Sequence, residues 1–151
     1  MSDADQELFW QIRHFIFSTI VERERPPTTG ETAFALKLDR EFVQSAYQWL
    51  NDKHALFLDP GTLNVRMAHP FSALPTGYRV HTSGHTYYAN CAWDSFGILA
   101  ALRQDGVIEA TRIGGQDTIT IEVSDDHVKG HDEVIHFLLP FAQWYDDLVF
   151  T

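Results

Sequence analysis

The spacing of the hydrophobic residues changes near residue 52, and this change limits the folds that the chain can adopt. In the first 24 residues the apolar side chains recur every three or four positions, which predicts an amphipathic helix. Its apolar stripe consists of Leu8, Phe9, Ile12, Phe15, Ile16, Thr19 and Ile20. Arg25-Pro26-Pro27 ends this helix, because proline cannot continue a helix and restrains the residue before it. After residue 52 the apolar runs are short and extended, so we expect an α+β fold with its helices first.

Two further helices and a hairpin are predicted in the same half of the chain. One helix covers residues 29–36, and the next follows Asp39, a residue typical of helix N-caps, and runs to about residue 51. The inner face of that helix is expected to contain Phe42, Val43, Ala46, Tyr47 and Leu50. The hairpin pairs residues 55–58 with 64–67 around a turn containing Pro60 and Gly61. Three helices followed by a hairpin is the order of a winged-helix module, and residues 1–75 are interpreted as one.

The second half of the chain, residues 76–151, is predicted to form a small mixed or antiparallel β-sheet domain. The boundary is placed in the link at residues 69–77, which contains proline and glycine. Two hairpins are expected around the turn sequences Ser83-Gly84 and Gly114-Gly115. Their strands would cover residues 78–81, 86–89, 107–112 and 118–123. An apolar helix is expected at residues 93–102, and a last strand at residues 134–139, before Pro140.

Composition and charge exclude several classes of protein. Hydrophobic residues make up 44% of the chain, which is enough for a core and argues against disorder. The net charge of −10 disfavours nucleic acids and anionic membranes as partners. No apolar run approaches the roughly 18 residues of a membrane span, and the acidic N-terminus is unlike a secretory signal. A single cysteine cannot form an internal disulfide, so we expect a cytoplasmic protein.

The candidate site is a Cys-x-x-Asp motif formed by Cys91 and Asp94. A strand is expected to end near Asn90 and a helix to begin there, so Cys91 would meet the positive end of the helix dipole, which favours thiolate. Asp94, three residues on, would project from the same face. A thiolate beside a carboxylate makes both ionisations harder, so one of the pair is expected to hold a proton. A soft nucleophile beside an acid suits binding a soft electrophile and transferring a proton to it.

The motif also has a purely structural interpretation. A single cysteine is commonly a small buried apolar residue. An aspartate in the first turn of a helix commonly serves the helix dipole. Spacing alone leaves both interpretations open.

Three stretches of the chain resemble the alkylmercury lyase (organomercurial lyase) family. They are Ala68-His69-Pro70-Phe71-Ser72, the core Tyr87-Tyr88-Ala89-Asn90-Cys91-Ala92-Trp93-Asp94, and residues 97–102. The tract at residues 136–151, HFLLPFAQWYDDLVFT, resembles the family's C-terminal part. The three helices and hairpin at the start are also similar to that family's N-terminal region.

The resemblance implies a mercury-detoxifying enzyme that splits carbon–mercury bonds by protonolysis, with no organic cofactor. It implies that Cys91 captures the mercury and that Asp94 donates the proton. Tyr88, Asn90 and Trp93 are expected to shape the pocket around them. The implied partners are an organomercurial substrate and a low-molecular-weight thiol or thiol-bearing mercury acceptor.

The sequence departs from the family pattern in its cysteine content. Family members place a second cysteine on the mercury, whereas Cys91 is the single cysteine here. Residues 144–151 resemble the stretch that leads directly into that second cysteine. The chain is therefore expected to be either truncated before it or a divergent member that works with Cys91 alone. In both cases we expect slow or absent activity.

Two alternatives remain open from the sequence. The first is a non-enzymatic winged-helix regulator or soft-metal-binding protein, and the second is an inactive family member that holds metal through Cys91. The i,i+4 pair His127 and His131 is interpreted as part of a solvated loop rather than a metal site, because Gly130 disfavours a helix there. His81 and His85 are interpreted as exposed turn residues.

Overall fold

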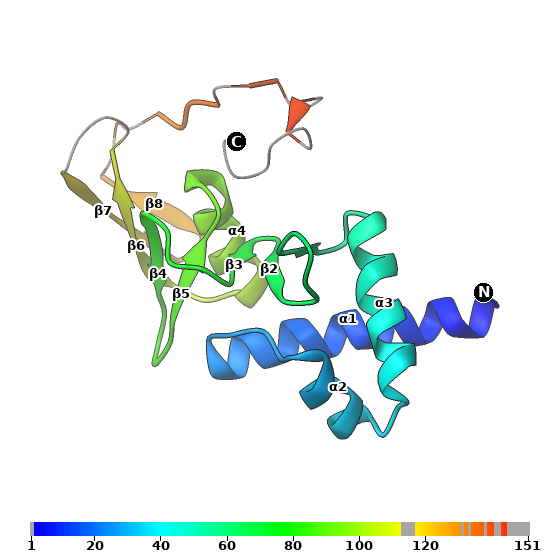
Figure 1. The fold of residues 1–151 in the computed structure, drawn as a ribbon. Helices are drawn as coiled ribbons and strands as arrows, with labels where there is room; N and C mark the ends of the chain where they lie inside the picture. The colour runs from blue at the N-terminus through cyan, green and yellow to red at the C-terminus, as the bar shows by residue number, and fades with distance from the viewer. Residues whose placement is uncertain are drawn as a thin grey trace.

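Three helices precede the first strand, as predicted (Figure 1). The computed structural model describes residues 2–112, 117–130, 132, 134–137, 139–140 and 143–144. The helices are α1 (Asp3–Arg23), α2 (Thr29–Leu36) and α3 (Arg40–Asp52). Each begins at a side-chain cap: Ser2 and Thr28 form capping boxes, and the Asp39 carboxylate accepts hydrogen bonds from the backbone of Glu41 and Phe42. Local sequence signals therefore set the start of all three helices.

The strands of the described residues form one eight-stranded antiparallel sheet with the order β1-β2-β3-β5-β4-β6-β7-β8. Along the chain come β1 (Phe57–Leu58), β2 (Val65–Ala68), β3 (Phe71–Ser72), β4 (Tyr78–His81), β5 (Thr86–Ala89), β6 (Gly106–Thr111), β7 (Thr118–Ser124) and β8 (His127–Lys129). A fourth helix, α4 (Ala92–Leu102), lies between β5 and β6 in sequence and packs against β4, β5 and β6. The three predicted hairpins and the predicted helix after Cys91 are thus confirmed.

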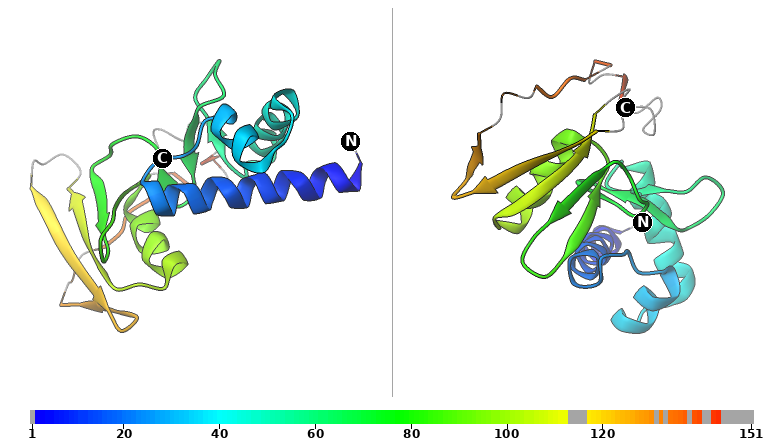
Figure 2. Two further views of the ribbon diagram at one scale, coloured as in Figure 1. Left: turned by 90° about the horizontal axis from the view of Figure 1, so that it is seen from below. Right: turned by 90° about the vertical axis from the view of Figure 1, so that its left-hand side faces the viewer.

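The hydrophobic core joins the N-terminal helices to the sheet. Ile12 and Ile16 of α1, Tyr47 of α3, Val80 of β4 and Ile98 of α4 are fully buried members of one cluster. Side chains alternate along the central strands, so Tyr87 and Ala89 face the core while Tyr88 does not. Figure 2 shows α1 running beneath the sheet, with α4 beside it. The core therefore holds the β5–α4 connection, which carries Cys91, from several sides.

Three local predictions differ from the structure. β3 lies within residues 69–77, which the sequence analysis interprets as a link. β8 contains His127, which the sequence analysis places in a solvated loop. β8 was missed because its three residues are all exposed, so it shows no hydrophobic alternation. The predicted strand at residues 134–139 is wrong over its described residues, which belong to no strand. Residues 134–136 instead line an apolar groove beside residues of β6 and β7.

Two assignments for the N-terminal half stay predictions. The sheet continues across the boundary placed near residue 75, since β2 pairs with β3 and β3 with β5. The division into residues 1–75 and 76–151 and the winged-helix interpretation are therefore left to experiment. No helix of the described residues is long and apolar enough to cross a membrane.

Candidate functional site

Cys91 lies at the junction between β5 and α4, where the sequence analysis placed it. It is the N-cap residue of α4, and its Sγ accepts a hydrogen bond from the Asp94 backbone N–H at 3.5 Å. The Ser95 backbone N–H and hydroxyl both donate to the Cys91 carbonyl oxygen at 3.2 Å. A sulfur atom therefore occupies the position that serine, threonine or aspartate commonly fills at a helix start.

Asp94 places its carboxylate beside the sulfur. The Cys91 thiol donates to Asp94 Oδ2 across 3.5 Å, and the same oxygen lies 3.5 Å from His69 Nδ1. The Asp94 side chain is mostly buried, with 16% of its surface exposed. The two residues of the Cys-x-x-Asp motif thus share one face of the first turn of α4, as their spacing predicts.

The surroundings of Cys91 raise the pKa of its thiol. Burial is the largest cause, and the neighbouring Asp94 carboxylate adds to it by charge repulsion. Hydrogen bonds from the backbone N–H groups of Asp94 and Trp93 act in the opposite direction. The sequence analysis named two opposing effects on this pKa, the helix terminus and the neighbouring carboxylate. In the structure, burial and the carboxylate together outweigh the helix terminus. The cysteine is therefore a neutral thiol at neutral pH, next to an acceptor for its proton.

Asn90 and His69 form the other polar side of the site. Asn90 Nδ2 lies 3.3 Å from His69 Nδ1 and donates to the carbonyl oxygens of Pro70 and Phe71 at 3.4 Å. The loop between β2 and β3 lies close to α4. A Cβ added at Gly97 of α4 would be 3.2 Å from Pro70 Cβ in that loop. Asn90 thus fixes the loop that carries His69 against the carboxyl group of Asp94.

A small pocket of about 70 Å³ opens at these groups. Its lining residues are His69, Asn90, Cys91, Trp93, Asp94, Phe137 and Trp144. The Phe137 ring stacks on the Trp144 ring with 5.0 Å between centroids and meets the Trp93 ring edge-on at 6.3 Å. The site therefore combines a thiol, a carboxyl group and an imidazole with an aromatic wall.

Tyr88 lies away from the other residues that the sequence analysis expects to shape the pocket. It lines a different pocket, of about 190 Å³, together with Arg79, Glu109 and Thr111. Its neighbours in the strand, Tyr87 and Ala89, are buried against the core. Because successive side chains of a strand point to opposite faces, Tyr88 projects away from that core face. Cys91, Asp94, Asn90 and Trp93 are brought together as predicted, and Tyr88 is not among them.

The family comparison matches the half of the chain that carries this site. The family model described as alkylmercury lyase matches residues 71–150, which is more than half of the 151 residues. The chain belongs to the alkylmercury lyase family. A comparison with curated protein sequences returned no match.

A solved structure supports the alkylmercury lyase fold. The chain is similar to the crystal structure of the mercury-bound form of MerB2, with a TM-score of 0.66 and 20% sequence identity. The match covers 81% of this chain and 58% of that one, so the chain spans less than two thirds of the length of that protein. At this identity the likeness concerns the fold.

Sequence reasoning missed His69, Phe137 and Trp144 as pocket residues of this alkylmercury lyase family member. All three lie in stretches that carried the family resemblance, so a signal existed, but their distance from Cys91 along the chain hid their role. No group of three or more metal-ligating side chains gathers within the described part of the chain. His127 lies on β8, while His131 falls outside the described residues.

Proposed function

We propose that the chain cleaves the carbon–mercury bond of an organomercurial by protonolysis, with Cys91 binding the mercury and Asp94 donating the proton. The observation that carries the proposal is the 3.5 Å contact between Cys91 Sγ and Asp94 Oδ2 inside the pocket. Mercury is soft and prefers thiolate ligands, and a carboxylic acid beside the sulfur can protonate the carbon. Membership of the alkylmercury lyase family supports this use of the two residues.

The first step joins Cys91 to the mercury. As the sulfur–mercury bond forms, the thiol proton passes to Asp94 Oδ2, to which the thiol already donates. The organomercurial enters with a small thiolate already bound to its mercury. This thiolate leaves with the electron pair of its own sulfur–mercury bond. The products are an organomercury group on Cys91 and a protonated Asp94, and mercury remains Hg(II).

The second step breaks the carbon–mercury bond. Asp94 gives its proton to the carbon, and the electron pair of the carbon–mercury bond becomes the new carbon–hydrogen bond. The hydrocarbon leaves, Asp94 is a carboxylate again, and the released thiolate takes the second position on the mercury. The oxidation state of mercury does not change.

Removal of the product requires another thiol, because Cys91 is the single cysteine of these 151 residues. An incoming low-molecular-weight thiol binds the mercury as thiolate, and its proton returns to Cys91. The mercury leaves with two external thiolates. We therefore propose that a small thiol, or a thiol-bearing acceptor, is the partner, as a reducing compartment such as the cytoplasm would supply. None of these steps uses an organic cofactor.

The test is hydrocarbon release from an organomercurial in the presence of excess small thiol, measured by gas chromatography. Cys91→Ser and Asp94→Asn are each expected to reduce release at least about 100-fold, since each removes a group that bonds to a reacting atom. Asp126→Asn is a matched control, because Asp126 lies in the exposed turn between β7 and β8. Unchanged release from Cys91→Ser would contradict the proposal. One mercury held per Cys91 without release would instead favour the soft-metal-binding alternative.

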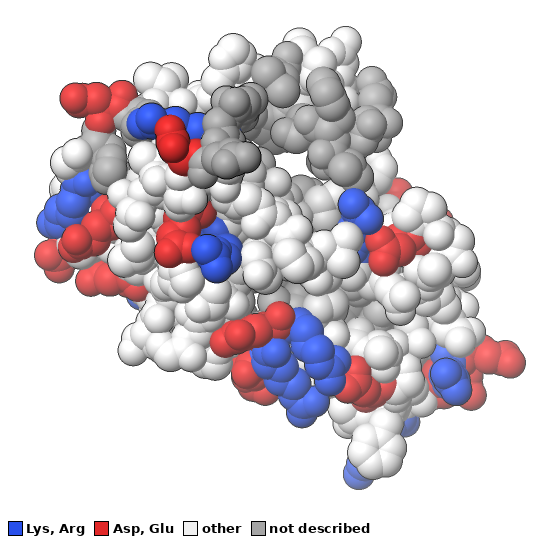
Figure 3. Space-filling model, turned by 60° about the vertical axis from the view of Figure 1, so that its left-hand side comes forward, with Lys and Arg blue, Asp and Glu red and all other residues white. Residues whose placement is uncertain are grey.

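The charge distribution gives no support to a DNA-binding function. The chain carries a net charge of −10, and on the face shown in Figure 3 the basic side chains lie beside acidic ones. Binding to DNA depends on neutralising phosphates with clustered Lys and Arg. We expect no salt-dependent retention on DNA, and such retention would revive the winged-helix regulator alternative.

A further inference from the structure

The orientation of the Asn90 amide decides what His69 can do at the site. Asn90 Nδ2 lies 3.4 Å from the carbonyl oxygens of both Pro70 and Phe71. Carbonyl oxygens only accept hydrogen bonds, so the amide nitrogen, and not the amide oxygen, must face them. Both hydrogens of this nitrogen are used by these two oxygens. His69 Nδ1, 3.3 Å from the same nitrogen, therefore meets a donor whose hydrogens are already engaged.

His69 Nδ1 also faces the Asp94 carboxylate. It lies 3.5 Å from Asp94 Oδ2. A carboxylate only accepts hydrogen bonds, so a bare ring nitrogen here would set two lone pairs against each other. The contact is favourable when Nδ1 carries a hydrogen, which is true of both the neutral Nδ1–H tautomer and the doubly protonated ring. Hydrogen bonds between reacting groups are often long before substrate binds and shorten in the complex.

We propose, resting on the proposed function, that His69 is a positioning residue that donates from Nδ1 to Asp94 Oδ2 and stabilises the carboxylate formed when Asp94 protonates the carbon. The Cys91 thiol contacts the same oxygen at 3.5 Å, so His69 holds this oxygen beside the sulfur. A donor aimed at the atom where negative charge develops lowers the barrier of the step that creates the charge. His69 keeps its own proton throughout, so the proton balance of both steps is unchanged.

The ring of His69 is held at its place from two sides. Phe57 of β1 meets it edge-on with 5.3 Å between the ring centroids. On the other side, Asn90 binds the backbone of the two residues that follow His69. The His69 side chain is 42% exposed, so its replacement leaves the hydrophobic core intact. Substitutions at this position therefore test the contact with Asp94 rather than the fold.

The first experiment measures kcat and KM for hydrocarbon release from a methylmercury thiolate. His69→Leu removes the donor and should lower kcat by about 10-fold or more with a smaller change in KM, since the lost interaction forms in the transition state. His69→Asn should recover most of this loss, because its Nδ2 occupies the place of the ring Nδ1. His14→Leu, a change at an exposed histidine of α1, is the matched control and should leave both constants unchanged. An unchanged kcat in His69→Leu would overturn the role of His69 in the reaction.

The second experiment needs no lyase activity. It measures the pH midpoint of Cys91 alkylation by iodoacetamide in the wild-type chain, His69→Leu, Asp94→Asn and the double variant. Without the donor the Asp94 carboxylate repels the Cys91 thiolate more strongly, so His69→Leu should raise the midpoint by about half a pH unit. In the Asp94→Asn background the carboxylate is absent, and the same change should produce no such shift. Tyr78 of β4 also interacts with the charge of Cys91, but it is present in all four proteins and its effect cancels.

The two experiments separate failure of this inference from failure of the proposed function. If the wild-type chain releases no hydrocarbon but the midpoint shift appears only when Asp94 is present, the proposed function fails and the donation from His69 to Asp94 stands. A shift that is equal in both backgrounds, or absent from both, overturns the inference whether or not the chain is active. His69→Gln serves as a second variant if the leucine variant does not fold by circular dichroism, because its amide lies at the distance of Nε2 and cannot replace Nδ1.

Discussion

At the scale of single residues, the surroundings of Cys91 make its thiol harder to ionise. Burial and the Asp94 carboxylate both raise the pKa of the thiol above its ordinary value of about 8.5. Thiolate is the reactive form, so alkylation by iodoacetamide should speed up with pH around a midpoint above that value. In Asp94→Asn the charge repulsion is lost while the burial remains. The midpoint should therefore move to lower pH than in the wild-type chain.

The control for this prediction is a short cysteine peptide alkylated under the same conditions. Because the chain contains one cysteine, mass spectrometry reports Cys91 alone. A midpoint for the wild-type chain at or below that of the peptide would show that the helix terminus, and not burial, dominates the thiol.

The same residues show what a sequence can and cannot predict about a site. Cys91 and Asp94 lie within one helical turn, so their spacing predicts their contact. His69 reaches Asp94 only because a loop 25 positions earlier folds against α4, and no local pattern encodes that approach. Tyr88 lies three residues from Cys91 but lines another pocket, because strand alternation turns its side chain to the other face of the sheet.

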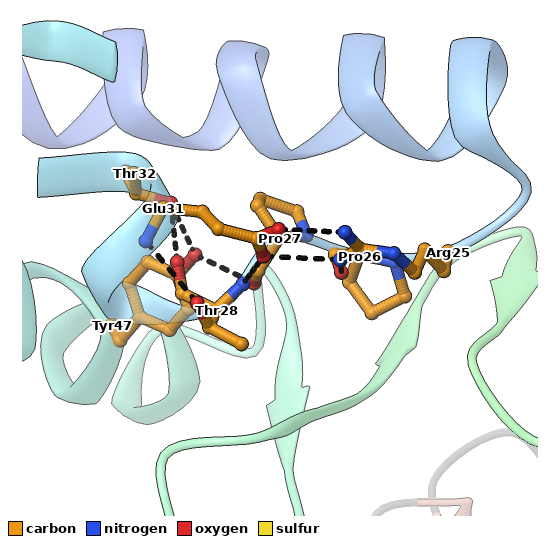
Figure 4. Close-up of polar contacts among 7 residues, drawn as sticks. All are labelled: Arg25, Pro26, Pro27, Thr28, Glu31, Thr32 and Tyr47. Atoms are coloured by element: carbon orange, nitrogen blue, oxygen red, sulfur yellow. Dashed lines mark hydrogen bonds and ion pairs between the residues drawn. The ribbon is translucent and has the colours of Figure 1, made fainter. Parts of the chain in front are cut away.

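At the scale of elements, Tyr47 joins α3 to the start of α2 (Figure 4). Its hydroxyl lies 2.8 Å from Thr32 Oγ1 and donates to the Pro27 carbonyl oxygen at 3.2 Å, and both side chains are fully buried. Tyr47→Phe should lower the free energy of unfolding by about 1–2 kcal/mol, because buried polar groups lose a partner. Urea unfolding measures this change. Tyr47→Phe combined with Thr32→Val should cost less than the sum of the two single changes, and strict additivity would contradict a direct interaction.

Tyr47 also makes a prediction about alkaline pH. Burial is the main cause that raises its pKa to about 12. The pKa of Tyr47 is higher in the folded state than in the unfolded chain, where it is about 10. The neutral hydroxyl therefore contributes its full share of the folding stability below about pH 10, and this contribution declines as the pH rises from 10 to 12. Tyr47→Phe should therefore lose less stability than the wild-type chain between pH 10 and 12. Tyr78 and Tyr87, whose pKa values are also raised, contribute equally to both proteins and cancel in the comparison.

Gly106 leaves no room for a side chain where β6, β4 and α4 meet. A Cβ at this position would lie 2.5 Å from the His81 carbonyl oxygen of β4 and 2.6 Å from Leu99 Cδ2 of α4. The first of these is backbone and cannot rotate away, so Gly106→Ala should destabilise the fold by about 1–3 kcal/mol. Thermal unfolding gives the measurement. Gly30→Ala in α2, where the nearest atoms are 3.9 Å away, should leave the protein unchanged or up to about 1 kcal/mol more stable.

The elements themselves were largely predictable from the sequence. Caps such as Asp39 and turns such as Ser83-Gly84 act within a few residues, and the structure has helices and hairpins where they indicate. The errors lie where local pattern and tertiary pairing differ. Residues 134–137 form an apolar run that finds no strand partner, and β8 pairs with β7 although its side chains are exposed.

At the scale of the whole molecule, contacts across the proposed boundary near residue 75 join the two halves of the chain. The Tyr87 hydroxyl donates to the Val21 carbonyl oxygen at 2.8 Å, and Glu24 Oε1 accepts from the Thr86 backbone and lies 3.2 Å from His85 Nδ1. The buried cluster of the core also draws on both halves. These contacts predict that the halves unfold together, even if they are separate domains by sequence.

Two probes in one variant test this coupling. With Trp93 and Trp144 replaced by Phe, the remaining tryptophans, Trp10 and Trp49, lie in α1 and α3 and report on the N-terminal half. A brief pulse of a thiol reagent at each urea concentration reports on Cys91 in the other half, because its partly buried thiol reacts fully only when exposed. Coincident midpoints are the expected result, since a shared core cannot be lost from one half alone. If Cys91 became reactive at a lower urea concentration than the tryptophan transition, the β5–α4 junction would unfold separately. The halves would then behave as the two domains that the sequence predicts.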